Sequence, residues 1–213
     1  AVFEPQPGLS HARNRAVGDA RGALIVWTDD DVAPEHDWLA CYVSASTAYP
    51  DVSFFGGPIE PMFDDDPPMW LSELWDDVAP YYACLDHGDA VFEMNEDTLP
   101  YGANFAVRTH VQRAYPFDSR YGRSENQMID GEETVAMLRM IEDGHKGQWL
   151  PTARIRHSLS SDRLSRQYLR ARSYGSGRTT AMLGTGLSRW PVSLLWLASM
   201  KHEVLYRTKH LAR

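Results

Sequence analysis

Three adjacent carboxylates, Asp29, Asp30 and Asp31, directly follow an apolar run over Ala23–Trp27. Adjacent negative charges repel one another, and a hard divalent cation such as Mg²⁺ or Mn²⁺ relieves that repulsion by taking carboxylate oxygens as ligands. Two carboxylates leave coordination positions open for the phosphates of a substrate. An EF-hand is excluded, because the sixth position of the loop is not glycine and no glutamate closes it. A metal–phosphate site and a solvated turn remain as the two interpretations.

A second acidic group, Asp130–Glu133, opens a segment of helical periodicity. Asp130 followed three residues later by Glu133 has the spacing of a helix-capping box. Alternatively, Glu132 or Glu133 is a general base that accepts a proton from an attacking hydroxyl group. The two interpretations are compatible, because a helix start also holds a side chain in a fixed place.

Residues around two expected strands complete the set of candidates. His157 ends a short extended segment, and an isolated histidine is either structural or a metal ligand. Gly102 and Ala103 are small enough for a ligand to approach the backbone closely, and Asn104 adds a polar group. These three residues are also compatible with the ordinary start of a strand.

Alternating helices and strands are expected to position these groups, which is the pattern of an α/β layer fold. The apolar run is continuous, as is typical of a parallel strand covered on both faces, and Ser10 is a suitable helix cap. Gly56 and Gly57 allow close backbone approach, and residues 60–99 are expected to form a long loop over one face. Further strands are expected over 52–59 and 103–108, and two short extended segments separated by Pro151 are expected within 148–157. Helices are expected over 8–20, 35–49, 130–144, 161–177 and 192–211.

The net charge of −8 is distributed unevenly along the chain. Residues 1–151 carry 27 acidic and 9 basic side chains, a balance of −18, whereas residues 152–213 carry 2 acidic and 12 basic ones, a balance of +10. A basic tail indicates contact with phosphates or an anionic membrane, or only a solvated arginine face, and the acidic body disfavours nucleic acid as a partner. The two cysteines have no redox or metal spacing, which fits a reducing cytoplasm.

The C-terminal tail contains an apolar run over Trp190–Met200, which is too short to span a bilayer. Basic residues follow at Lys201, Arg207, Lys209 and Arg213. This combination predicts a helix that lies in the membrane interface, as a peripheral contact on the inner face. The alternative is a C-terminal helix that packs on the sheet.

Four motifs resemble, in this order, family-two glycosyltransferases of the GT-A fold. They read PGLSHARNRAVGDARGALIVWTDDDVAPEHDWL, PYGANFAVR, FDSRYGR and GEETVAMLRMIEDGHKGQWLPTARIRH, and the likeness covers roughly residues 3–178. The resemblance is strongest to bacterial enzymes of polysaccharide biosynthesis. It implies a GT-A-type, Rossmann-like mixed sheet with flanking helices over 1–157, as a partial catalytic domain, and a basic helical segment over 158–213. It also implies an N-terminal truncation, because the half that holds the nucleotide base and ribose in the family is missing.

The resemblance assigns the donor side of the site through a DxD motif. Asp29 and Asp31 would hold Mg²⁺ or Mn²⁺ on the diphosphate of a nucleotide sugar, a UDP- or GDP-sugar, with Asp30 nearby. His157 matches the histidine that completes the metal or diphosphate site in the family. Arg13 matches a helix residue near the nucleotide.

The resemblance also assigns the acceptor side. Glu133 occupies the position of the catalytic base, with Glu132 beside it, and the choice between the two stays open. Gly102, Ala103 and Asn104 match the segment under the donor sugar and the acceptor. The implied activity is inverting sugar transfer to a saccharide or lipid-linked hydroxyl, in polysaccharide or cell-envelope glycan synthesis. The alternative is a truncated, non-catalytic remnant that binds sugar or lipid phosphates.

Overall fold

The computed structural model describes residues 2–122 and 130–186. The chain forms two sheets, of five and three strands. In spatial order, the larger sheet contains β1 (Leu24–Thr28), β6 (Asn104–Arg108), β3 (Val52–Gly56), β7 (Lys146–Trp149) and β5 (Phe92–Met94). The smaller sheet contains β2 (Val32–Pro34), β8 (Ile155–Leu159) and β4 (Ile59–Phe63). Both sheets mix parallel and antiparallel pairs.

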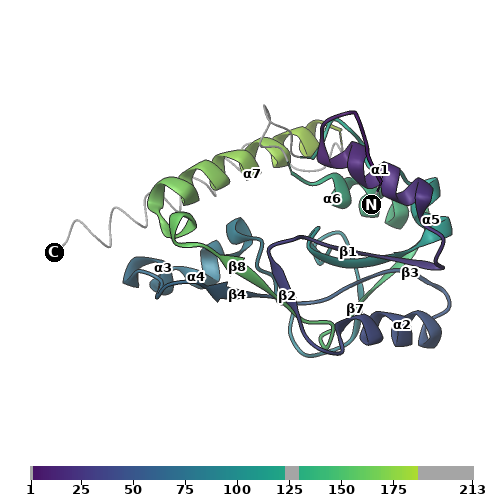
Figure 1. The fold of residues 1–213 in the computed structure, drawn as a ribbon, viewed down its shortest axis with the longest axis horizontal. Coiled ribbons are helices and arrows are strands. Elements are labelled where there is room, and N and C mark those ends of the chain that lie inside the picture. Colours follow the sequence, from purple (N-terminus) through teal and green to yellow (C-terminus); the bar gives the residue numbers. More distant parts are fainter. Residues whose placement is uncertain (1, 123–129, 187–213) are drawn as a thin grey trace.

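Helices cover both faces of the larger sheet. On one face lie α1 (Leu9–Asp19), α5 (Thr109–Ala114) and α6 (Glu132–Glu142), and on the other lies α2 (Trp38–Ala48), as Figure 1 shows. The first group packs on a core that includes Phe54, Phe105 and Trp149, whereas α2 packs on Phe55 and Ala106. Neighbouring residues of one strand therefore point to opposite layers, and the expected α/β layer fold is confirmed.

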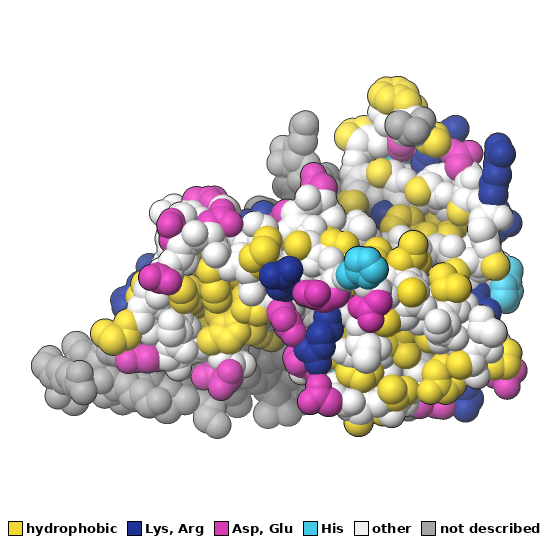
Figure 2. Space-filling model, turned by 60° about the horizontal axis from the view of Figure 1, so that its bottom comes forward, with side chains coloured by type: hydrophobic (Ala, Val, Ile, Leu, Met, Phe, Trp, Pro, Cys, Tyr) yellow, Lys and Arg dark blue, Asp and Glu magenta, His cyan; other side chains and the backbone are white. Residues whose placement is uncertain are grey.

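The surface of α2 is unusual for a helix that covers a sheet, because Trp38–Ala48 contains no charged residue. Its outward side leaves Leu39 and Val43 each 54% exposed. Figure 2 brings this side of the molecule forward and shows apolar side chains spread over it among polar atoms.

Strand β1 differs from its sequence prediction in pairing and in burial. Ile25 and Trp27 pack toward the α1 side and Leu24 and Val26 toward α2, so the expectation of cover on both faces is correct. However, β1 pairs antiparallel with β6 and lies at the edge of the described sheet, where its apolar residues are only half-buried. A continuous apolar run indicates that both faces of the strand are covered, but it does not indicate whether the neighbouring strand is parallel or antiparallel.

The segment expected as a loop over 60–99 contains several short elements. After β4 come α3 (Met69–Glu73), α4 (Trp75–Val78), the 3₁₀ helix η1 (Ala79–Tyr82) and β5. Helices α3, α4 and η1 pack on a cluster that includes Leu71, Tyr82 and Leu159. This packing explains why the segment is ordered although its apolar residues show no regular spacing. The glycine prediction is confirmed, since a Cβ on Gly57 would overlap the carbonyl oxygen of Ala153.

The C-terminal part of the described chain consists of the 3₁₀ helix η2 (Ser161–Leu164) and α7 (Arg166–Gly186), which runs along the top of the molecule in Figure 1. Helix α7 is longer than the helix expected over 161–177. The predicted helix over 192–211 and its membrane contact lie outside the described residues. Across residues 2–122 and 130–186, no helix combines the length and the apolar character needed to cross a bilayer.

Candidate functional site

Arg13 lies at the centre of the candidate site. Helix α1 points its side chain inward, and the residue is only 6% exposed. Its guanidinium donates hydrogen bonds to Glu132 Oε1 over 2.7 Å and to the carbonyl oxygen of Gly102 over 3.1 Å. It also lies 3.7 Å from Asp29 Oδ1 and 3.9 Å from Glu133 Oε2. One cation therefore contacts four of the predicted site residues, which lie in the turn after β1, at the start of α6 and in the segment before β6.

Aromatic rings surround the same guanidinium. Its carbon lies 5.5 Å from the ring centre of Trp27, 6.0 Å from that of Phe105 and 5.5 Å from that of Phe117. Such contacts attract the cation to the ring faces and exclude water, which strengthens its interaction with the carboxylates. Arg13 was predicted from the resemblance as a residue near the nucleotide, and in the structure its buried contacts are with Glu132 and Gly102.

The start of α6 corrects one sequence interpretation. The helix is capped by Gly131, whose φ of +100° a non-glycine residue rarely adopts, and no side chain caps the helix. Asp130 forms an ion pair with Arg172 of α7 over 2.8 Å, so the capping box between Asp130 and Glu133 is not formed. Likewise, Ser10 is not a cap, because it donates its hydroxyl to the carbonyl oxygen of Tyr121 over 2.6 Å. Both polar side chains make long-range contacts that no local pattern reveals.

The side-chain carboxyl of Glu133 has a pKa above its ordinary value. Burial, and next the negative charge of Glu132, raise its pKa to about 7, although Arg13 opposes the shift. The physical cause is that a buried carboxylate loses its hydration while a second carboxylate stands beside it. A carboxylate whose pKa lies near neutrality is suited to accept a proton at physiological pH.

A second cluster is formed by Asp31, His157 and Arg163. Asp31 Oδ2 lies 3.3 Å from His157 Nε2 and accepts a hydrogen bond from Arg163 Nη2 over 2.9 Å. Partial burial alone would raise the pKa of Asp31, but the neighbouring His157 and Arg163 outweigh it and lower that pKa. Strands β2 and β8 create this contact, because Val32 pairs with His157 across the smaller sheet.

The donor atoms of this cluster fit a divalent cation. His157 Nδ1 lies 2.8 Å from the carbonyl oxygen of Tyr82, which can only accept a hydrogen bond, so Nδ1 carries a proton and Nε2 is the nitrogen that faces Asp31. A histidine that donates its other N–H to a carbonyl oxygen is the usual arrangement of a metal ligand. Arg163 lies beside both groups, with Nη2 2.9 Å from Asp31 Oδ2 and Nη1 3.4 Å from His157 Nε2, so the pair already has a positively charged neighbour.

The three predicted metal ligands are not gathered at one point. Asp31 and His157 are in contact, whereas Asp29 lies against Arg13 with its side chain 43% exposed. Asp30 is exposed in the turn between β1 and β2. Within the part of the chain that the structure describes, no three His, Cys, Asp or Glu side chains form a cluster able to hold a metal ion. Asp31 and His157 would hold the cation, together with oxygens supplied by a diphosphate.

Gly102 and Ala103 precede β6, Asn104 is its first residue, and all three contact other parts of the protein. Ala103 is 2% exposed and packs with Ile59 and Ile155. The amide of Asn104 is fully buried and makes four hydrogen bonds inside the protein, so its role toward a ligand stays a prediction. Gly102 was predicted to allow a ligand to approach the backbone closely, and in the structure the group that approaches it is the Arg13 side chain. A Cβ on Gly102 would lie 3.0 Å from Arg13 Nη2.

Sequence reasoning missed Arg163 and the buried environment of Arg13. Arg163 entered only the charge balance of the tail, although its place six residues after His157 in a short basic segment was a usable signal. A signal for the Arg13 environment was its helical spacing from Val17, four residues later, which packs in the core on the same face of α1.

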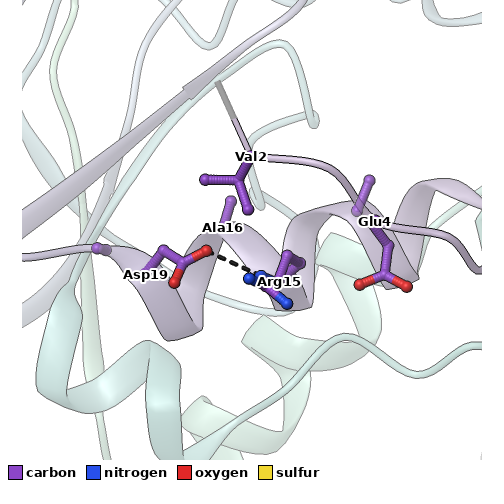
Figure 3. Close-up of a pocket in the computed structure, with 7 residues that line it drawn as sticks. Val2, Glu4, Arg15, Ala16 and Asp19 are labelled. Carbon is purple, nitrogen blue, oxygen red and sulfur yellow. Dashed lines mark hydrogen bonds and ion pairs between the residues drawn. The ribbon is translucent and has the colours of Figure 1, made fainter.

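A separate shallow pocket of about 340 Å³ lies on the outer side of α1. Figure 3 shows Val2 above α1 and Glu4 beside it, with Arg15 and Asp19 forming an ion pair of 2.9 Å on the helix. The lining contains none of the predicted site residues, and its one arginine, Arg15, is already paired with Asp19. The pocket is therefore not the candidate site.

Comparison with known proteins gives one informative likeness. No protein-family model and no curated protein matches the chain. Among solved structures, it is similar to GalNAc-T7 crystallised with UDP, GalNAc and Mn²⁺, with 14% identity and a TM-score of 0.51, over 99% of this chain and 45% of that one. The chain has a GT-A-type fold. The predicted fold class, a mixed α/β sheet with flanking helices, is thereby confirmed.

Two further structures match more weakly. One is glucosyl-3-phosphoglycerate synthase from Mycobacterium tuberculosis in complex with Mn²⁺, UDP-glucose and glycerol 3-phosphate, with 14% identity, a TM-score of 0.37, and coverage of 74% of this chain and 47% of that one. The other is a mycobacterial protein, with 14% identity, a TM-score of 0.41, and coverage of 76% and 48%. The chain thus spans about half of the length of the structures that it matches.

Proposed function

We propose that this chain is the metal- and acceptor-binding part of an inverting glycosyltransferase that uses a nucleotide sugar. One observation carries the proposal: the turn over 29–31 touches both clusters. Asp29 contacts the Arg13 group, which includes Glu133, and Asp31 contacts His157 and Arg163. A carboxylate suited to accept a proton thus stands beside a pair suited to hold a metal–diphosphate, and sugar transfer from a nucleotide sugar needs both.

In the proposed reaction Glu133 accepts the proton of an acceptor hydroxyl group. The hydroxyl oxygen forms a bond to the anomeric carbon while the bond from that carbon to the diphosphate oxygen breaks. The electron pair of the broken bond leaves with the nucleoside diphosphate. A bound Mg²⁺ or Mn²⁺ would supply positive charge for this leaving group, and Arg163 offers a second positive charge beside Asp31.

The finer assignments are part of the same proposal. They comprise membership of family two, a bacterial polysaccharide or cell-envelope pathway, a UDP- or GDP-sugar donor, a saccharide or lipid-linked acceptor, and a cytoplasmic location with peripheral membrane contact. They rest on the sequence motifs and on the tail over 188–213. The missing nucleotide-binding half also stays a prediction, which the DNA upstream of this reading frame would test.

The donor site is tested by calorimetry of nucleoside diphosphate binding in the presence of Mn²⁺. Replacing Asp31 by alanine removes a proposed ligand and the charge beside His157, so metal-dependent affinity is expected to fall roughly tenfold or more. Asp51→Ala, at an exposed aspartate of the turn before β3, is the matched control and should bind as the unmodified chain does. Unchanged metal-dependent affinity in Asp31→Ala would show that the donor site is elsewhere.

A further inference from the structure

The site contains two adjacent glutamates and one buried cation. Glu132 is 2% exposed and Glu133 is 9% exposed, so water solvates neither carboxylate well. Arg13 Nη1 lies 2.7 Å from Glu132 Oε1 but 3.9 Å from Glu133 Oε2. The first distance is a charge-assisted hydrogen bond, and the second is only a charge–charge contact. The guanidinium therefore neutralises Glu132 in preference to Glu133.

The other charged groups around the pair do not supply a second cation to Glu133. Asp130 is negative and is already paired with Arg172 over 2.8 Å. Asp29, the third carboxylate near Arg13, is 43% exposed in its side chain and is stabilised by water. Tyr101 is neutral, since burial and the charge of Glu133 both raise its pKa. Among residues 2–122 and 130–186, Arg13 is a cation that contacts both of these buried carboxylates, and it lies closer to Glu132.

Packing holds the Arg13 guanidinium beside Glu132 and prevents it from moving to Glu133. Arg13 is held by the Gly102 carbonyl oxygen and by the three rings that surround it. Glu132 is enclosed on its other side by Gly122, where a Cβ would lie 3.3 Å from Glu132 Oε2 and 2.6 Å from Ser10 Oγ.

We propose that Arg13 is a positioning residue that makes Glu133, and not Glu132, the proton acceptor of the site. The inference rests on the proposed function, and it settles which of the two glutamates acts as the base. Arg13 binds Glu132 as a fixed, ionised counter-ion, and Glu133 keeps the proton affinity that the reaction needs. The raised pKa of Glu133 agrees with this division.

The test is a pH titration of glutamate side-chain carboxyl signals by ¹³C NMR on the full 213-residue chain, which needs no substrate. One carboxyl is expected to titrate at a pH of about 7, and Glu133→Gln should remove that signal. Glu132→Gln frees Arg13 to pair with Glu133 and removes the neighbouring charge. The near-neutral midpoint should then move down by roughly one pH unit or more.

Two arginine variants complete the experiment. Arg13→Met should move the midpoint upward, and Arg15→Met, which removes an exposed arginine of the same helix paired with Asp19, should leave it unchanged. If Arg13→Met does not fold, Glu132→Gln still decides. The proposal is overturned if Glu132→Gln leaves the midpoint in place, or if the signal survives in Glu133→Gln and disappears in Glu132→Gln. Because no transfer is measured, failure of the proposed activity would give a different result from failure of this inference.

Discussion

Glu133→Gln is expected to lower sugar transfer by roughly 10²–10⁴-fold, the range associated with loss of a positioned general base. Glutamine keeps the shape of the side chain but cannot accept the proton of the acceptor hydroxyl. Binding of the nucleoside diphosphate should survive, because Asp31 and His157 are unchanged. The rate is measured as release of nucleoside diphosphate from a panel of UDP- and GDP-sugars.

The pH profile gives an independent check of the same role. The pKa of Glu133 is raised to about 7, so the carboxylate form that accepts a proton is populated above this pH and lost below it. Transfer by the unmodified chain should therefore rise with pH through this value, and the residual activity of Glu133→Gln should lack that step. Near-normal turnover in Glu133→Gln with a large loss in Glu132→Gln would move the base to Glu132. A chain that binds donor without any transfer would support the non-catalytic alternative.

Asn104→Ala is expected to destabilise the fold by about 3 kcal/mol or more, because each buried polar group left without a partner costs roughly 1–3 kcal/mol. The amide oxygen of Asn104 accepts hydrogen bonds from Trp38 Nε1 and the Tyr42 hydroxyl, both over 2.7 Å. Its nitrogen donates to the carbonyl oxygens of Pro58 over 2.9 Å and Ala153 over 2.8 Å. The side chain thus ties α2 and β6 to the loops that follow β3 and β7.

The free energy of unfolding, measured by urea titration, checks this prediction. Asn95→Ala is the matched control, since Asn95 is exposed and its hydrogen bonds stay within its own turn. That control is expected to lose about 1 kcal/mol or less. A loss of the same small size in Asn104→Ala would mean that the four buried hydrogen bonds do not stabilise the fold.

The elements of the fold that could be predicted are those set by local pattern. Helix α6 was predicted to end at Gly144, and the structure places that glycine directly after the helix with a φ of +86°. The small size of Gly57 indicated close backbone contact, which the Ala153 carbonyl oxygen makes. In both cases the absence of a side chain on glycine has a steric consequence that the residue type alone indicates, although the partner of Gly57 could not be predicted.

Features that depend on long-range contacts could not be predicted. The antiparallel pairing of β1 depends on β6, about 80 residues away, whose own pattern gives no direction. Ser10 has the residue type of a helix cap, but its hydroxyl donates a hydrogen bond to the carbonyl oxygen of Tyr121, 111 residues away along the chain. For the candidate site, the motifs led to Asp31, His157 and Glu133, while the contacts of Arg13 and Arg163 required the three-dimensional structure.

The central claim is that Asp31 and His157 hold a metal-bound diphosphate, and paramagnetic broadening by Mn²⁺ tests it most directly. With UDP or GDP present, substoichiometric Mn²⁺ should broaden the ring signals of His157 selectively. His110 is the internal control, because it is exposed on α5, beyond the end of β6 that pairs with the start of β1. Its signals should stay sharp. Signals of His157 that stay as sharp as those of His110 throughout the Mn²⁺ titration, with nucleotide in excess, would contradict the account.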